Sequence, residues 1–138
     1  MTGKRCLDLF AGSGALGMEA ASRGATEVVM VENNRGVFRV LQENIRKLNF
    51  HNIALRNEDG LNFANRGNEQ FDVIFLDPPF QSDCLGKLLP VLAKQLTPQG
   101  LLYVESGTEF EAGEPWQVYK QGRAGAVHYQ LLQLIQND

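Results

Sequence analysis

The sequence predicts an α/β fold, a three-layer sandwich in which a mostly parallel sheet lies between helices and ends in a C-terminal antiparallel hairpin. Three observations lead to this prediction. The chain has 138 residues, so we expect residues 1–138 to form a single domain. Short apolar runs alternate with helical patterns, and strands joined by crossover helices must run parallel. The last two strand patterns have only a glycine-containing turn between them, which indicates a hairpin.

Each predicted strand is a short run of apolar, mostly branched or aromatic residues that ends at turn or cap residues. The predicted parallel strands are Arg5–Phe10, Glu27–Glu32, Ile53–Arg56, Phe71–Leu76 and Leu101–Glu105. The last of these follows a predicted turn at Pro98–Gly100. The hairpin strands are Trp116–Lys120 and Val127–Leu134, with Gly122–Gly125 as the connection and Trp116 in the core.

Helices are predicted where apolar residues recur every three or four positions. Leu16–Arg23 is the first, closed by Gly24 in a left-handed cap position. Asn33 or Asn34 can cap the second, whose apolar positions are Val37, Val40, Leu41, Ile45 and Leu48. A short helix fits between the third and fourth strands. The fourth carries Leu85, Leu88, Leu89 and Leu92; Pro90 indicates that it kinks or begins nearby.

Composition and charge exclude several classes of protein. The content of 43% hydrophobic and 21% charged residues is that of a globular chain, and no apolar run approaches the roughly 18 residues of a membrane span. The net charge is −3, which gives no indication of nucleic-acid binding. Cys6 and Cys84 lie far apart and there are two histidines, so we expect no metal site, no disulfide and a reducing cytoplasm.

A glycine-rich loop follows the first predicted strand. Gly12, Gly14 and Gly17 match the pattern GxGxxG between a strand and a helix, where glycines allow a tight turn and a close approach of the backbone to a ligand. An ordinary βα turn or a dinucleotide site would both fit. Asp8 disfavours the dinucleotide, because a carboxylate inside the first strand needs polar partners.

Three further acidic residues lie at or just after the ends of later predicted strands. Glu32 stands 20 residues after Gly12, the spacing at which a carboxylate binds a ribose diol, although a solvated strand end has the same sequence. Asp59 follows the third strand, where it can contact a ligand or cap the next helix. Glu105 ends the fifth strand and lies either in the site or on the surface.

The run Asp77-Pro78-Pro79-Phe80 follows the fourth strand. Two prolines fix the backbone and remove two N–H donors, so the local carbonyls can accept from a ligand. Asp77 adds a carboxylate acceptor and Phe80 a flat apolar face. This set suits a planar base that carries an exocyclic amine; a rigid turn with a core phenylalanine is the alternative.

The run from Asp8 to Gly14 resembles motif I of class I S-adenosylmethionine-dependent methyltransferases, which have a Rossmann-like sheet. With FDVIFLDPPF, LLYVES and GRAGAVHYQLL, nearly the whole chain resembles the bacterial 16S ribosomal RNA guanine-N2 methyltransferases of the RsmD type. The resemblance implies a SAM-dependent methyltransferase domain over residues 1–138. It assigns Asp77, Pro78 and Phe80 to catalysis. It assigns cofactor binding to Asp8, Phe10, Gly12, Gly14, Glu32 and Asp59.

The resemblance also implies partners: 16S rRNA or the assembling small ribosomal subunit, with the enzyme acting as a monomer. Family members usually begin several dozen residues earlier with a basic segment, whereas motif I here starts at residue 6. The chain is therefore interpreted as a fragment, an alternative start or a short member. Other functions stay open: an adenine-N6 methyltransferase, a SAM-binding fragment without activity and, disfavoured by Asp8 and the hairpin, an NAD-linked oxidoreductase.

Overall fold

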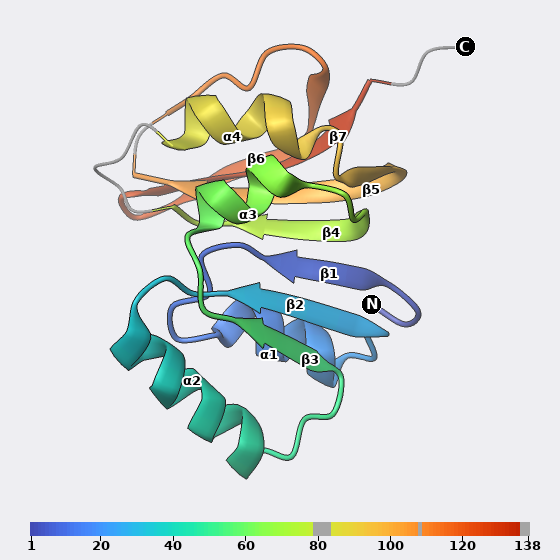
Figure 1. The fold of residues 1–138 in the computed structure, drawn as a ribbon. Coiled ribbons are helices and arrows are strands. Elements are labelled where there is room, and N and C mark those ends of the chain that lie inside the picture. Colours follow the sequence, from blue (N-terminus) through green and yellow to red (C-terminus); the bar gives the residue numbers. More distant parts are fainter. Residues whose placement is uncertain (79–83, 108, 136–138) are drawn as a thin grey trace.

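The computed structural model describes residues 1–78, 84–107 and 109–135, and these form four helices and one seven-stranded sheet (Figure 1). The strands are β1 (Arg5–Asp8), β2 (Glu27–Val31), β3 (Ile53–Arg56), β4 (Phe71–Leu76), β5 (Leu96–Ser106), β6 (Trp116–Ala124) and β7 (Val127–Leu134). The helices are α1 (Ala15–Ser22), α2 (Arg35–Lys47), α3 (Gly60–Arg66) and α4 (Cys84–Leu92).

The strand order is β3-β2-β1-β4-β5-β7-β6. The first five strands pair in parallel, and β7 pairs antiparallel with both β5 and β6. The predicted mostly parallel sheet with a late antiparallel hairpin is therefore confirmed. The order reverses where β1 pairs with β4, for example Cys6 with Val73, and ligands of such sheets bind beyond the strand ends at this kind of boundary.

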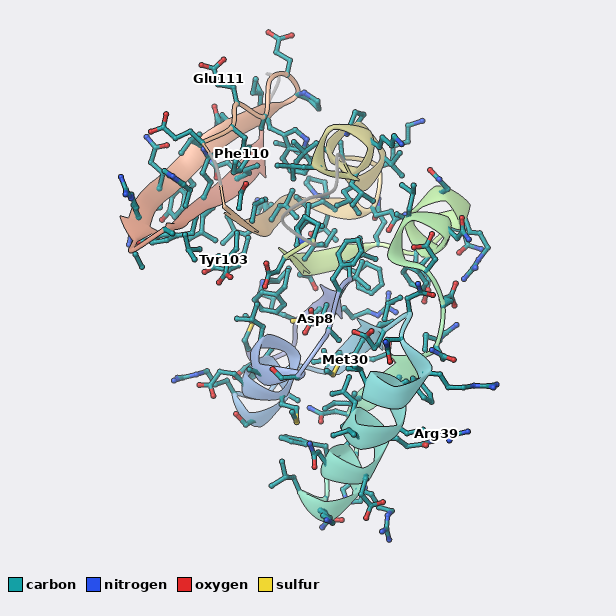
Figure 2. All side chains as sticks on the ribbon, turned by 90° about the vertical axis from the view of Figure 1, so that its left-hand side faces the viewer. Asp8, Met30, Arg39, Tyr103, Phe110 and Glu111 are labelled. Carbon is teal, nitrogen blue, oxygen red and sulfur yellow. The ribbon has the colours of Figure 1, made fainter. Side chains whose placement is uncertain are left out.

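Helices cover both faces of the sheet (Figure 2). On one face α1 and α2 contribute Ala20 and Leu41 to a cluster with Met30, because small and branched residues recur on the inner sides of these helices. On the other face α3 and α4 contribute Phe63 and Leu88 to the larger cluster. Three layers result, as the alternation of strands and helices predicted.

Four predicted strands differ from the structure in their bounds. Strands β1 and β2 end slightly earlier than predicted, at Asp8 and Val31. The larger differences are in β5 and β6. Strand β5 begins at Leu96, so the predicted turn Pro98–Gly100 lies inside it, at a shift in register opposite Phe71 and Val73. Strand β6 runs on to Ala124, and the turn to β7 is only Gly125 and Ala126, with Gly125 at φ 62°. In both places pairing with a neighbouring strand overrides residues that favour turns.

The helices also differ from expectation in detail. Helix α4 is continuous through Pro90, which precedes the helix end by two residues, so the predicted start near the proline is wrong. In α2 Asn34 is the cap and accepts from the Val37 N–H, as predicted. Of the apolar positions in this helix Leu41 is buried, whereas Val40 and Leu48 are 61% and 62% exposed.

Two buried side chains, Trp116 and Cys6, bear on the predictions. Trp116 lies in the core, as predicted, and its indole N–H donates to the Leu89 carbonyl. Cys6 is a free, buried thiol, and burial raises its pKa to about 11, so the thiol stays protonated at neutral pH. Within the described residues, no helix is long and apolar enough to cross a bilayer.

Candidate functional site

A pocket of about 900 Å³ lies at the carboxyl ends of the parallel strands. Figure 2 views the molecule from this end, with Asp8 near the middle. The pocket collects seven of the predicted site residues: Asp8, Phe10, Gly12, Glu32, Asp59, Asp77 and Pro78. Gly14, in the same glycine loop, does not line the pocket, and Phe80 lies outside the described residues.

Asp8 ends β1 and is 3% exposed. Its Oδ2 accepts from the Gly17 N–H at 3.1 Å, so the carboxyl group satisfies a donor in the first turn of α1 that Gly14, the cap residue, cannot satisfy with a side chain. A Cβ on Gly17 would lie 3.0 Å from the same Oδ2. The third glycine of the motif therefore allows this contact.

Gly14 has a different requirement. Its φ is 82°, a left-handed conformation that favours glycine, and a Cβ there would lie 2.4 Å from Leu41 Cδ2 and 2.9 Å from Met30 Cε. The loop thus packs its backbone directly on α2 and β2. Gly12, at φ 54°, has open space around it and leaves its N–H for Glu32.

Burial raises the pKa of Asp8 to about 7; the Gly17 N–H opposes this shift, and the charges of Asp77 and Glu32 add to it. Asp8 is therefore poised to change its ionisation near neutral pH when a cation arrives beside it. A carboxyl group with such a raised pKa is typical of functional sites, whereas an ordinary surface aspartate is fully ionised at neutral pH.

Glu32 follows β2 and is held by two backbone donors. Its Oε1 accepts from the Gly12 N–H at 2.8 Å and its Oε2 from the Asn34 N–H at 2.9 Å. The carboxylate thus joins the glycine loop to the start of α2. Each oxygen keeps a further lone pair, so the group can still accept two hydroxyl hydrogens from a ligand.

Of the two alternatives left open for Asp59, the structure shows the helix cap, and contact with a ligand stays a prediction. Asp59 caps α3, with Oδ2 accepting from the Asn62 N–H at 3.3 Å, and it also lines the pocket. The next residue, Gly60, sits against Phe10, whose ring carbons would be 3.0 Å from a Cβ there. Phe10 and the start of α3 therefore form one wall of the pocket.

Asp77 and Glu105 stand side by side across the ends of β4 and β5, because Leu76 pairs with Val104 one residue earlier. Both line the pocket. Burial raises the pKa of Asp77, and the charge of Glu105 and a hydrogen bond with it raise the pKa further. Tyr103 donates its hydroxyl to Glu105 Oε1 at 2.8 Å. Of the two positions left open for Glu105, the structure thus places it in the pocket.

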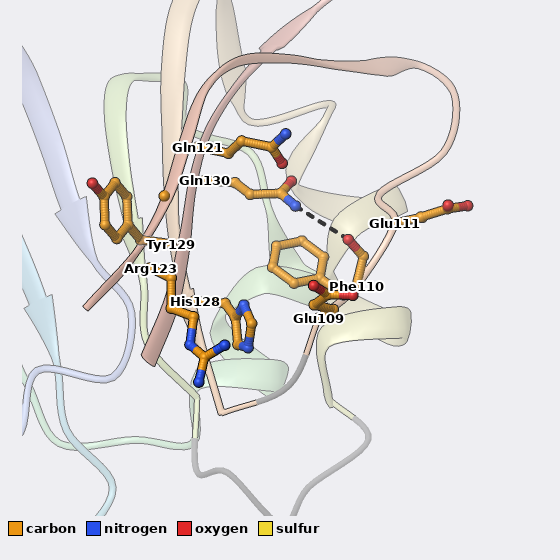
Figure 3. A pocket seen from close by; sticks show the side chains of 9 residues that line it. Glu109, Phe110, Glu111, Gln121, Arg123, His128, Tyr129 and Gln130 are labelled. Atoms are coloured by element: carbon orange, nitrogen blue, oxygen red, sulfur yellow. Dashed lines mark hydrogen bonds between the residues drawn. The ribbon is translucent and has the colours of Figure 1, made fainter. Parts of the chain in front are cut away.

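A second pocket, of about 610 Å³, lies between the β6–β7 hairpin and the segment that carries Phe110 (Figure 3). Gln130 is 9% exposed there and donates to the Phe110 carbonyl at 3.1 Å, while Arg123 and His128 lie at the rim. None of the predicted site residues that the structure describes lines it. In the described ranges, no group of three or more His, Cys, Asp or Glu side chains is arranged to hold a metal ion.

The sequence did not predict every residue of the main pocket. Ser13, Asn33 and Asn34 also line it, and Asn34 was predicted only as a helix cap. They follow from the same signal, since residues just beyond the end of a parallel strand gather at one edge of the sheet. The contact between Glu105 and Asp77 requires the pairing of β4 with β5, which motif spacing does not give.

A sheet in the order 3-2-1-4-5-7-6, with a glycine loop after β1 and acidic residues at or just after the ends of β1, β2 and β4, defines a Rossmann-like methyltransferase. Comparison with known proteins narrows this class. A model of the family described as Conserved hypothetical protein 95 matches residues 1–133, and the chain belongs to this family.

Two curated relatives are 36% identical over 136 residues. Ribosomal RNA small subunit methyltransferase D of Escherichia coli matches 94% of this chain, which spans 68% of that protein. The protein of the same name from Haemophilus influenzae matches 93% of this chain, which spans 70% of it.

Solved structures agree with the fold. The structure of a methyltransferase from Escherichia coli, yhhF, has a TM-score of 0.90 at 34% identity and covers 96% of this chain and 76% of its own. A methyltransferase named SMU.776, solved with SAH, has a TM-score of 0.80 over 96% of this chain and 46% of its own. At 16% identity this second likeness concerns the fold alone.

Proposed function

We propose that the protein transfers a methyl group from S-adenosylmethionine to the exocyclic N2 amine of a guanine in small-subunit ribosomal RNA. The observation that carries the proposal is the pocket itself. It brings the charged acceptor Glu32 and the acceptor pair Asp77 and Pro78 to one cavity. The two curated relatives, both named Ribosomal RNA small subunit methyltransferase D, supply the RNA class.

The residues fit S-adenosylmethionine by charge and by donor pattern. The Glu32 carboxylate would accept from the two ribose hydroxyls, and Asp59 from the adenine amino group. Phe10 would contact the adenosine part. Asp8 and the backbone at Gly12 would hold the methionine part, because a nearly buried carboxyl group can compensate its ammonium charge. When bound, this molecule supplies a methyl group on a positively charged sulfur that needs no further activation.

The acceptor base would lie against Asp77 and Pro78. An exocyclic amine is a weak nucleophile because its lone pair is delocalised into the ring. The Asp77 carboxylate and the Pro78 carbonyl can accept its two hydrogens, which favours a pyramidal nitrogen with its lone pair directed at the methyl group. Such positioning contributes roughly 7–11 kcal/mol, and the carboxylate also stabilises the positive charge that develops on nitrogen.

The guanine must leave its stack to reach this position, at a cost of a few kcal/mol. We propose that Phe80 offsets part of this cost by stacking on the base. The partner is then 16S rRNA or the assembling small subunit, and the predicted cytoplasmic location belongs to the same proposal. The catalytic assignment of Asp77, Pro78 and Phe80 rests on the resemblance and on the placement of the first two in the pocket.

The test is methyl transfer from labelled S-adenosylmethionine to small subunits, to protein-free small-subunit RNA and to DNA. The product nucleoside is then identified by digestion and mass spectrometry. We expect N2-methylguanine from small-subunit RNA and none with Asp77→Ala. Phe80→Tyr should keep activity, and Phe80→Ala should lose stacking worth roughly 1–3 kcal/mol. N6-methyladenine would instead support the adenine-N6 alternative, which uses the same acceptor pair.

A further inference from the structure

The carboxyl groups of Asp77 and Glu105 form a pair at the edge of the main pocket. Residues 76 and 104 are paired partners on β4 and β5, so the next residue of each strand lies beside the other. Both side chains line the same cavity, and burial and then the charge of Glu105 raise the pKa of Asp77. Two carboxylates placed in this way repel each other, and a proton taken up by Asp77 relieves the repulsion.

Glu105 is oriented from below by Tyr103. The two residues are two apart on β5 and therefore point to the same face of the sheet. The Tyr103 hydroxyl donates to Glu105 Oε1 at 2.8 Å. Its ring is itself fixed, edge-on to Phe75 at 6.3 Å between centroids and stacked on Tyr129 at 6.4 Å. An aromatic ladder across β4, β5 and β7 thus sets the position of the second carboxyl group.

No cation relieves the repulsion in this cluster as far as the described residues show. The groups that act electrostatically on Asp77, on Tyr103 and on the nearby Asp8 are carboxyl groups and a second phenol. Glu105 acts on Asp77. Asp77 and Glu32 act on Asp8, and Glu105, Asp77 and Tyr129 act on Tyr103. Burial and Glu105 raise the pKa of Tyr103, so its hydroxyl remains a donor.

We infer that Glu105, oriented by the Tyr103 hydroxyl, is a positioning residue that forms with Asp77 a proton-accepting carboxyl pair for the methylated amine. The inference rests on the function proposed above. In the reaction the N2 lone pair forms the new N–C bond, and the C–S bond breaks with its electrons passing to sulfur. The nitrogen then carries one proton too many. That proton passes along the existing N–H···O contact to Asp77, is shared with Glu105, and leaves to water.

The pair suits this task better than a single exposed carboxylate. A proton acceptor works best when its own proton affinity lies near the working pH. Burial and the neighbouring charge of Glu105 raise the pKa of Asp77, which moves it in that direction. Glu105 thereby acts through Asp77, without needing to touch the base.

The first test is the pH dependence of single-turnover methyl transfer with saturating S-adenosylmethionine. For Glu105→Gln we expect the maximal rate to fall about 10- to 100-fold, the acid limb of the profile to move to lower pH, and the KM for S-adenosylmethionine to stay within about twofold. Tyr103→Phe, which keeps the ring stack, should lower the rate several-fold with the same unchanged KM. The matched control variants are Glu111→Gln and Tyr119→Phe, which make the same changes at exposed residues and should behave as wild type.

The second test needs no RNA. Carbon-detected NMR of the carboxyl groups should show Asp77 titrating at lower pH in Glu105→Gln than in the wild type, and at the wild-type pH in Glu111→Gln. An unchanged Asp77 titration, an unchanged acid limb or a loss confined to the KM for S-adenosylmethionine would overturn the inference. If Asp77 moves as expected but the wild type methylates no RNA, the carboxyl pair stands and the proposed substrate is wrong.

Discussion

Removal of the Glu32 carboxylate tests the cofactor site most directly. In the structure each oxygen of this group accepts one backbone N–H, Gly12 at 2.8 Å and Asn34 at 2.9 Å, and keeps one lone pair for a ligand hydroxyl. Hydrogen bonds to a charged group contribute roughly 1.5–3 kcal/mol. Glu32→Ala should therefore weaken binding of S-adenosylmethionine about 10- to 150-fold.

The loss should extend to any ligand that carries the same ribose. Titration calorimetry with S-adenosylmethionine, S-adenosylhomocysteine and adenosine measures this directly, because adenosine retains the two hydroxyls but lacks the methionine part. Glu32→Gln, which keeps a single acceptor oxygen, should lie between Ala and wild type. Thermal melts of each variant establish that the fold persists.

A matched control is Glu109→Ala, which removes an exposed carboxylate at the other pocket and should leave affinity unchanged. Equal binding by wild type and Glu32→Ala would refute the reasoning and remove Glu32 from the site. A loss for the methionine-containing ligands but not for adenosine would show that Glu32 acts on another part of the ligand.

Three further results are expected. Burial raises the pKa of Asp8 in the folded state to about 7, so the stability that its protonated form contributes is present below its unfolded pKa and is lost as pH rises through 7. The free energy of unfolding, measured with urea, should therefore be lower at pH 8 than at pH 5 in the wild type, by roughly 1.4 kcal/mol per unit of pKa shift. Asp8→Asn should not show this decrease. Gly14→Ala should lower the free energy of unfolding by about 1–3 kcal/mol or more, since it adds a clash with Leu41 to backbone strain, and thermal melts measure the loss. Gly113→Ala should lower it less, because Gly113, at φ 71°, has open space around it. With a net charge of −3 the chain should bind small-subunit RNA weakly in filter-binding titrations near physiological salt, and an added basic N-terminal segment should restore binding with a steeper salt dependence; submicromolar, base-dependent binding by the chain alone would contradict this.

The sequence predicted best those elements whose local signals agree with their pairing. Three strands have the predicted bounds, because turn residues flank each of these runs of apolar or β-branched residues. They are Ile53–Arg56, Phe71–Leu76 and Val127–Leu134. The bounds of β5 and β6 were wrong where proline and glycine lie within paired strands. Local propensity cannot anticipate such pairing, since the partner strand lies elsewhere in the sequence.

The site follows the same division. Asp8, Glu32 and Asp77 were predictable because each follows or ends a strand, and parallel strands bring their carboxyl ends together. The state of these groups was not predictable. The contacts of Asp8 with Gly17 and of Asp77 with Glu105 depend on the packing of a helix turn and on strand register. The spacing of residues along the chain predicts neither the packing of the helix turn nor the strand register.

The boundary between β1 and β4 has a consequence for the stability of the protein. Residues before this boundary supply Asp8 and Glu32 to the pocket, and residues after it supply Asp77 and Glu105. A molecule that contacts both sets ties together two halves of the sheet whose paired residues, such as Cys6 and Val73, lie far apart in sequence. A free ligand concentration of 100 times the dissociation constant would raise the free energy of unfolding by about 2.7 kcal/mol. Amide hydrogen exchange along this strand pair would slow with it, so occupancy of the pocket and opening of the sheet are two sides of one equilibrium.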